Sequence, residues 1–330
     1  MQTQQNNNSN LITATLHNCR IGRPVLVPNL YVCPILSDIN QQPEYISLKQ
    51  AYKNKLVAIE ETETVSTTKI ENRSKKPLFI MNGEILEGAK QNRVINDSIL
   101  IPSQTKKRVD VSCVEEGRWS NNYESFKQSD DLFNYTSKNE KSKSVFESKL
   151  RSGSRKADQS GVWDEIRKKQ SRMGVRSQTY SAKDTYTQFD EKLRRYERVI
   201  KTTSNQVGVV FYLKNQCVGM DLFDSSVTYQ EFSKKILRSI AIDAIEEDKR
   251  TSFSGFGPEN NLGKKLIDQF FDLMVSLKEK TIPAPYMGTE VVLNYPALNY
   301  YGSGIANNGR IIHLNCFHHV EFATSQYSTH

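Results

Sequence analysis

The sequence predicts an α+β protein with a β-rich body of mainly antiparallel strands, a helical basic insertion and a C-terminal hairpin–helix–helix–strand unit. Three observations carry this. Short runs rich in β-branched residues fill the first third of the chain. Apolar residues then become sparse, and Ser, Lys, Asn and Gln dominate. Finally, a hairpin pattern precedes two amphipathic helical patterns. Strands grouped in this way favour an antiparallel sheet or sandwich over βαβ units.

Residues 1–10 are polar and uncharged after Met1, which predicts a disordered tail. The β-rich part of the body is expected over 11–119, with a short helix within 45–54 and a loop over 72–77. The expected strands cover 11–16, 24–27, 31–35, 56–59, 65–70, 78–81, 94–101 and 108–114.

A basic insertion is expected over 120–201, with two or three short helices. Val162 and Trp163 lie four and three residues before Ile166, and Leu193 lies three residues before Tyr196, which is the spacing of one helix face. The interval 138–200 holds 17 Lys and Arg against 9 Asp and Glu, which equals the +8 charge of the whole chain. Such charge favours contact with nucleic acid. The alternation of acids with bases instead favours a solvated face.

The last part of the chain, 202–330, is expected to complete the same body. A hairpin is predicted over 206–223, an amphipathic helix over 228–245 and a second over 262–277. Strands are predicted over 290–293 and 310–317, the latter after the turn at 307–309. Gly302 to Gly304 is interpreted as a flexible hairpin loop.

Cysteine and hydropathy patterns limit the class of protein. The five Cys include no C-x-x-C pair, which indicates a reducing, cytoplasmic environment rather than a disulfide framework. The sequence contains no run of about eighteen apolar residues, so no membrane span is predicted. Strand alternation around His313, Cys316 and His318 places no three good ligands on one face, so no metal site is predicted. No motif identifies a cofactor.

The densest group of charges lies beside glycines in two blocks, 83–93 and 115–119, which predict a polar site built on turns. Carboxylates there could act as acids, bases or ligands. Arg and Lys could bind phosphate, and Trp could stack on a ring. The candidate catalytic residues are Glu84, Glu87 and Glu115; the candidate ligand-binding residues are Lys90, Gln91, Arg93, Arg118 and Trp119.

The structural alternative is that these acids and bases pair with one another and hold two turns together, with Trp119 in the core. An exposed pocket with at least one Glu and one Arg would favour a ligand site. Full mutual pairing without a cavity would favour a structural role.

Several blocks in order resemble a known family: GEILEGAKQNR, CVEEGRW, Val162-Trp163, GVVFYLKNQCVGMDLFDS and GRIIHL. Over roughly 75–320 the chain is similar to bacterial domains named for association with ADP-ribosylglycohydrolase and rhodanese-phosphatase modules. The long basic stretch 123–156 and the pair His318-His319 depart from that pattern. The resemblance implies a role near ADP-ribose or nucleotide metabolism, in a bacterial system of phage defence.

Two functions therefore stand as hypotheses. The first is binding or processing of a nucleotide-derived small molecule such as ADP-ribose. The second is a non-enzymatic interaction module whose basic insertion contacts a protein or nucleic acid. The sequence does not decide whether the protein is an enzyme.

Overall fold

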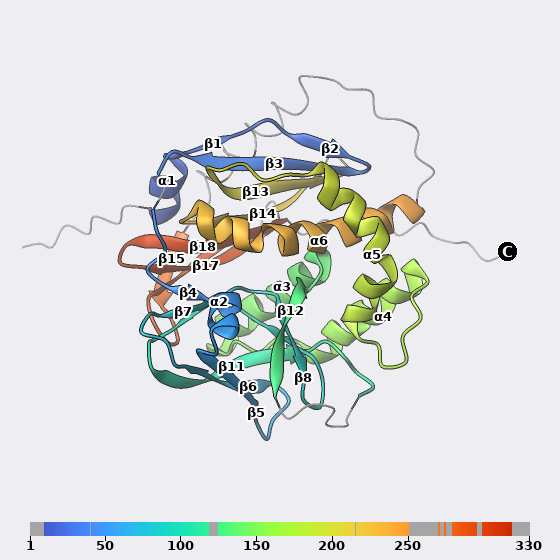
Figure 1. Cartoon of the computed structure of the whole chain (residues 1–330), viewed down its shortest axis with the longest axis horizontal. Coiled ribbons are helices and arrows are strands. Elements are labelled where there is room, and N and C mark those ends of the chain that lie inside the picture. Colours follow the sequence, from blue (N-terminus) through green and yellow to red (C-terminus); the bar gives the residue numbers. More distant parts are fainter. Residues whose placement is uncertain are drawn as a thin grey trace, which may run out of the picture.

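The computed structural model describes residues 10–39, 41–118, 125–214, 216–250, 270, 274, 279–295 and 299–318. Helices and mostly antiparallel strands are both abundant, so the predicted α+β class with a β-rich body is confirmed. Figure 1 shows one large sheet along one side of the molecule and a second group of strands on the opposite side, with the helices α3 (Tyr135–Ser152) and α6 (Ser226–Arg250) between them.

The large sheet has nine strands and combines the two ends of the chain. Its path is β1-β3-β13-β14-β18-β17-β16-β15, with β2 paired to β3. Because β3 pairs with β13, an N-terminal strand lies beside the hairpin expected near the C-terminus. The strands are β1 Cys19–Ile21, β2 Val25–Val27, β3 Leu30–Ser37, β13 Gln206–Leu213, β14 Gln216–Phe223, β15 Glu279–Pro283, β16 Thr289–Tyr295, β17 Tyr300–Asn307 and β18 Arg310–His318.

The remaining strands form a six-stranded sheet, β12-β8-β9-β11-β6-β5, and a three-stranded sheet, β10-β7-β4. All of these pairs are antiparallel except β4 with β7. The strands are β4 Ile46–Ser47, β5 Val57–Glu61, β6 Thr67–Asn72, β7 Leu78–Ile80, β8 Glu84–Gly88, β9 Arg93–Ile95, β10 Ile99–Ile101, β11 Thr105–Cys113 and β12 Phe126–Leu132.

Helix α6 confirms the amphipathic helix expected over 228–245. Its residues Phe232, Ile236 and Ile240 are buried against aromatic residues of the large sheet, including Phe211 and Phe223. A helical stripe of this kind buries apolar surface at roughly 25 cal/mol per Å². The other helices are α1 Leu11–Leu16, α2 Leu48–Lys53, α4 Gln159–Met173 and α5 Ala182–Val199.

The strand expected over 11–16 is wrong, since this segment is the helix α1. Asn10 caps its first turn by accepting from the N–H groups of Ile12 and Thr13. The carboxylate of Glu279 accepts from Leu11 N at 3.2 Å and from Ile12 N at 3.0 Å. These acceptors satisfy N–H groups that a helix N-terminus otherwise leaves unpaired, and one of them comes from far along the chain.

Three further local expectations are corrected. The run 94–101 is divided between β9 and β10, which belong to different sheets. The loop expected at Gly302 to Gly304 is part of β17. There, a Cβ on Gly302 would lie 2.4 Å from Asn315 O, so the glycine permits close pairing with β18 rather than flexibility. The block 83–93 contains strands β8 and β9 as well as turns.

The helices expected within 120–201 are present but long, and the segment also contributes β12 to the six-stranded sheet. Of the helix predicted over 262–277, only Phe270 and Met274 lie within the described residues, and both are helical and buried. The division into 11–119, 120–201 and 202–330 stays a prediction.

Much of the charge in the basic segment is used inside the fold. Lys138, Lys141 and Lys169 are buried. Lys149 contacts Asp97 and Glu290. Ion pairs of this kind hold the segment on its neighbours and leave fewer cations for an outer nucleic-acid surface than the sequence count suggests.

Candidate functional site

A continuous chain of buried polar side chains crosses the middle of the molecule. We call it the buried polar chain; it consists of Lys141, Asn82, Ser98, His313, Asp221 and Lys138.

The buried polar chain begins and ends on α3, and its first residue is Lys141. Its Nζ donates to Asn82 Oδ1 at 2.8 Å, to Asn96 O at 2.7 Å and to Ile95 O at 3.1 Å. The backbone N–H of Asn82 in turn donates to Ser98 Oγ at 2.9 Å. All three acceptors of Lys141 are neutral, so this ammonium group is held without a directly bonded carboxylate.

The other half of the buried polar chain reaches the large sheet through His313 on β18 and Asp221 on β14. Ser98 Oγ lies 2.8 Å from His313 Nδ1, and His313 Nε2 lies 3.3 Å from Asp221 Oδ1. Because the Asp221 carboxylate can only accept, the ring proton is assigned to His313 Nε2, and the Ser98 hydroxyl donates to the unprotonated Nδ1. Lys138 Nζ closes the chain at 3.4 Å from Asp221 Oδ2.

Burial governs the titration of these groups. Burial lowers the pKa of Lys141 to about 7 and also lowers the pKa of His313 and of Lys138. Burial opposes ionisation of Asp221, but attraction to Lys138 and the His313 hydrogen bond outweigh it and lower the Asp221 pKa. Asp221, His313 and Lys138 are fully buried, so this serine–histidine–aspartate line joins α3 to two sheets and offers no substrate access.

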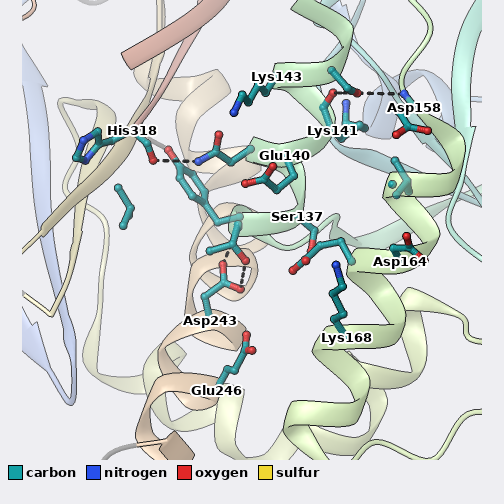
Figure 2. Close-up of a pocket in the computed structure, with 18 of the residues that line it drawn as sticks. Ser137, Glu140, Lys141, Lys143, Asp158, Asp164, Lys168, Asp243, Glu246 and His318 are labelled. Carbon is teal, nitrogen blue, oxygen red and sulfur yellow. Dashed lines mark hydrogen bonds between the residues drawn. The ribbon is translucent and has the colours of Figure 1, made fainter. Parts of the chain in front are cut away.

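A cavity of about 620 Å³ lies beside the buried polar chain, between α3, α4 and α6. Figure 2 shows His318 at one end, Asp158, Asp164 and Lys168 at the other, and Glu140 between them. This volume is typical of small-molecule sites.

The acidic residues that α6 contributes to the cavity wall, Asp243 and Glu246, are neutralised by cations of α4. Asp243 and Glu246 both contact Lys169 Nζ, the former at 2.6 Å. Asp243 also accepts from the N–H of Thr136 at 2.9 Å at the start of α3. Burial opposes the charge of Lys169, but the two carboxylates outweigh it and raise its pKa. This wall is therefore rigid and internally compensated.

The opposite walls keep charges that no neighbour neutralises. Within the described part of the chain, Lys143, Lys168, Glu147 and Asp158 line the cavity without forming an ion pair. The cavity thus presents both cations and carboxylates, and it can offer hydrogen-bond acceptors to hydroxyl groups and charge-assisted donors to phosphate.

The two blocks predicted to form a site do meet in space. Asn92 N donates to Glu115 Oε2 at 3.1 Å, and Arg118 Nη1 donates to Ala89 O at 2.7 Å. Arg118 also donates two hydrogen bonds to the Glu115 carboxylate, from Nε to Oε1 at 2.9 Å and from Nη2 to Oε2 at 2.7 Å. Burial opposes the charge of Glu115, but hydrogen bonds from Arg118, Asn92 and Thr179 outweigh it and lower the Glu115 pKa.

The other predicted site residues do not join the Glu115–Arg118 pair, and those that the structure describes have other surroundings. Arg93 is buried and contacts Gln91 and Glu61. Glu84 lies buried against Gln128 and Lys235, and burial raises its pKa. Glu87 pairs with Lys183. Lys90 is exposed, and Trp119 lies outside the described residues. None of the predicted residues that the structure describes lines the cavity between α3, α4 and α6.

Arg118→Ala is expected to lower the free energy of unfolding by about 3 kcal/mol, because it removes the cation paired with the buried Glu115 carboxylate and a donor to two backbone carbonyls. Urea denaturation would measure the loss. The exposed neighbour Lys90→Ala is the control and should be close to neutral. An unchanged stability in Arg118→Ala would contradict the structural role of this arginine.

Sequence reasoning missed the cavity residues for two reasons. Most of them come from three helices and the others from strands of the large sheet, and the Lys, Glu and Asp side chains on the helices resemble an ordinary solvated helix face. The buried polar chain beside the cavity did leave one signal: Asp221 stands among apolar residues in the hairpin 206–223 and marks a buried charge.

In the part of the chain that the structure describes, no cluster of three His, Cys, Asp or Glu is placed to hold a metal ion. Among the same residues, no helix has the length and apolar character needed to cross a membrane.

Comparison with known proteins gives one match. A family model described as the ARG and Rhodanese-Phosphatase-superfamily-associated Protein domain, ARPP-1, matches residues 18–317. The match begins well before residue 75, so it includes the N-terminal strands of the large sheet. No curated protein and no solved structure matches the chain.

Proposed function

We propose that this chain, which belongs to the ARPP-1 family, binds a nucleotide-derived small molecule such as ADP-ribose in the cavity between α3, α4 and α6. The observation that carries the proposal is a polar cavity of about 620 Å³ with both cations and carboxylates not used in ion pairs. The family name places the domain in the company of ADP-ribosylglycohydrolase modules.

The charges of the cavity suit the parts of such a ligand. Carboxylates accept hydrogen bonds from ribose hydroxyls, and Glu147 and Asp158 lie on the α3 and α4 sides. Lys143 and Lys168 can approach a diphosphate as compact cations. Lys168 extends from α4 toward the cavity in Figure 2, so its loss removes charge without disturbing the wall at α6.

Lys168→Ala is expected to weaken the binding of ADP-ribose about 5- to 20-fold, since it removes one charge-assisted contact. Isothermal titration calorimetry would compare wild type, Lys168→Ala and Lys192→Ala. Lys192 is an exposed lysine on α5 and does not line the cavity, so its variant makes the same charge change elsewhere. Equal affinity in Lys168→Ala and wild type would place the ligand outside the cavity.

The competing candidate is a non-enzymatic interaction module, which the mutual pairing of Glu115 and Arg118 favours. Thermal denaturation with ADP-ribose, NAD and ribose 5-phosphate separates the two. A ligand that binds only the folded state raises the melting temperature. No shift with any of the three would favour the interaction module.

A cytoplasmic location and a place in bacterial phage defence, both inferred from sequence, stay predictions. The same holds for the catalytic role of Glu84, Glu87 and Glu115 and for the ligand-binding role of Lys90, Gln91, Arg93, Arg118 and Trp119.

A further inference from the structure

Asn139 has an acceptor atom that the described residues of the chain leave unused. This residue lies on α3, lines the cavity and is only 8% exposed. Its Nδ2 donates to His318 O at 3.0 Å, which fixes the orientation of the amide. Its Oδ1 is buried and has no hydrogen-bond partner among the described residues. Buried acceptors are nearly always paired, so an orphaned one beside a cavity needs an explanation.

The wall around Asn139 differs from the rest of the cavity. Three apolar or aromatic residues of the lining come from elements near β18, which ends at His318: Leu213 and Val218 lie on the paired strands β13 and β14, and Tyr135 donates from its hydroxyl to Cys316 O. Figure 2 places His318 at the end of the cavity opposite Asp164 and Lys168. The His318 ring is itself held in place, stacked on Tyr300 with ring centroids 4.3 Å apart and donating from Nδ1 to Cys217 O at 2.9 Å. One end of the cavity is therefore apolar and aromatic, and the other is charged.

Such a division matches a ligand with a flat apolar ring at one end and hydroxyl or phosphate groups at the other. A single unpaired acceptor in an apolar corner selects a ring that carries an N–H donor on its edge. A ring with a carbonyl at the same position would set oxygen against oxygen. Asn139 cannot turn to offer its NH₂ group without losing the bond to His318 O.

We propose that the His318 end of the cavity is a base subsite, in which Asn139 Oδ1 accepts a hydrogen bond from the exocyclic amino group of adenine. The inference rests on the proposed function, because it places the base of the same nucleotide-derived ligand. Asn139 is then the residue that distinguishes an adenine from a hypoxanthine derivative.

The test compares ADP-ribose with inosine diphosphate ribose by calorimetry on the full chain. Wild type is expected to bind the adenine compound at least about tenfold more tightly, because the hypoxanthine carbonyl meets the unpaired oxygen. Asn139→Leu keeps the size of the side chain and removes its acceptor, and the preference should fall to within about twofold.

A matched control is Asn18→Leu. Asn18 also donates its amide to a backbone carbonyl, Ala14 O at 3.0 Å, but it lies after α1 and does not line the cavity. Its variant should keep the wild-type preference, which separates the loss of this acceptor from a general effect of replacing Asn by Leu.

The outcomes separate this inference from the one on which it rests. Equal binding of the two ligands by wild type overturns the base subsite and leaves the proposed function standing. A preference retained in Asn139→Leu overturns the role of Asn139. No binding of ADP-ribose at all overturns both. The wild-type comparison needs no variant, so a poorly folded Asn139→Leu does not prevent a decision.

Discussion

Lys138→Met is expected to destabilise the protein by about 3–5 kcal/mol, because it leaves the Asp221 carboxylate buried without its cation. Met keeps most of the volume of the lysine stem, so a cavity is not the cause. The ammonium group also lies 4.7 Å from the centre of the Tyr135 ring, a contact that the variant loses as well. Urea denaturation followed by circular dichroism at pH 7 would measure the change.

A second substitution separates charge from packing. In Lys138→Met with Asp221→Asn, no charge is left unpaired, and the Asn side-chain oxygen can still accept from His313 Nε2. We expect the double variant to recover about 1–3 kcal/mol relative to the sum of the single changes. Additive losses would show that the two side chains act independently. Lys143→Met, on the same helix but without an ion pair among the described residues, should change stability by less than about 0.5 kcal/mol.

These lysines also explain why α3 was not predicted. Sequence patterns treat lysine as a surface residue, since it is rarely buried unless paired. The buried face of α3 includes Ser137, Lys138, Lys141 and Ser142, so the helix has no continuous apolar stripe. Its packing depends on Asp221 and Asn82, which are distant in the sequence. No local pattern could have indicated them.

Where local patterns determine the structure, the prediction was good. The hairpin of β13 and β14 and the helix α6 follow from alternation and from a helical stripe, and both were confirmed. The turn at Asn308 and Gly309 also has the positive φ values of 51° and 74° that its sequence requires. Helix α1 was missed because Ile12, Thr13 and Thr15 favour a strand locally, whereas a carboxylate from β15 satisfies the helix N-terminus.

The candidate site shows the same contrast. Glu115 and Arg118 are three residues apart, and their pairing was one of the alternatives that the sequence offered. The cavity could not be predicted in this way, because α3, α4 and α6 bring its walls together only after folding. Asn139 in particular stands between Lys138 and Glu140 in a polar stretch, where nothing in the sequence sets it apart. Its unpaired oxygen is a property of the folded structure alone.

Lys141 should make stability depend on pH in an unusual direction. Its pKa is about 7 in the folded protein against 10.5 for the ordinary group, with burial as the main cause; Asp97 partly offsets it, and Lys138 and Lys149 add to it. The unfolded chain therefore binds the proton more tightly between these two values. Folding becomes more favourable as pH rises from about 7 toward 10.5, and this contribution is lost as pH falls through 7.

The expected size is on the order of 4 kcal/mol over that range, from the difference between the two pKa values. The measurement is the difference in unfolding free energy between wild type and Lys141→Met, at pH 7 and at pH 9.5. Taking the difference removes the titration of groups that both proteins share. The wild type should gain relative to the variant as pH rises. Lys143→Met, which removes a half-buried lysine from the same helix, is the control for the loss of a lysine from α3. A constant difference for Lys141→Met would mean that the three oxygens around the Lys141 ammonium, on Asn82, Ile95 and Asn96, hold its proton against the cost of burial.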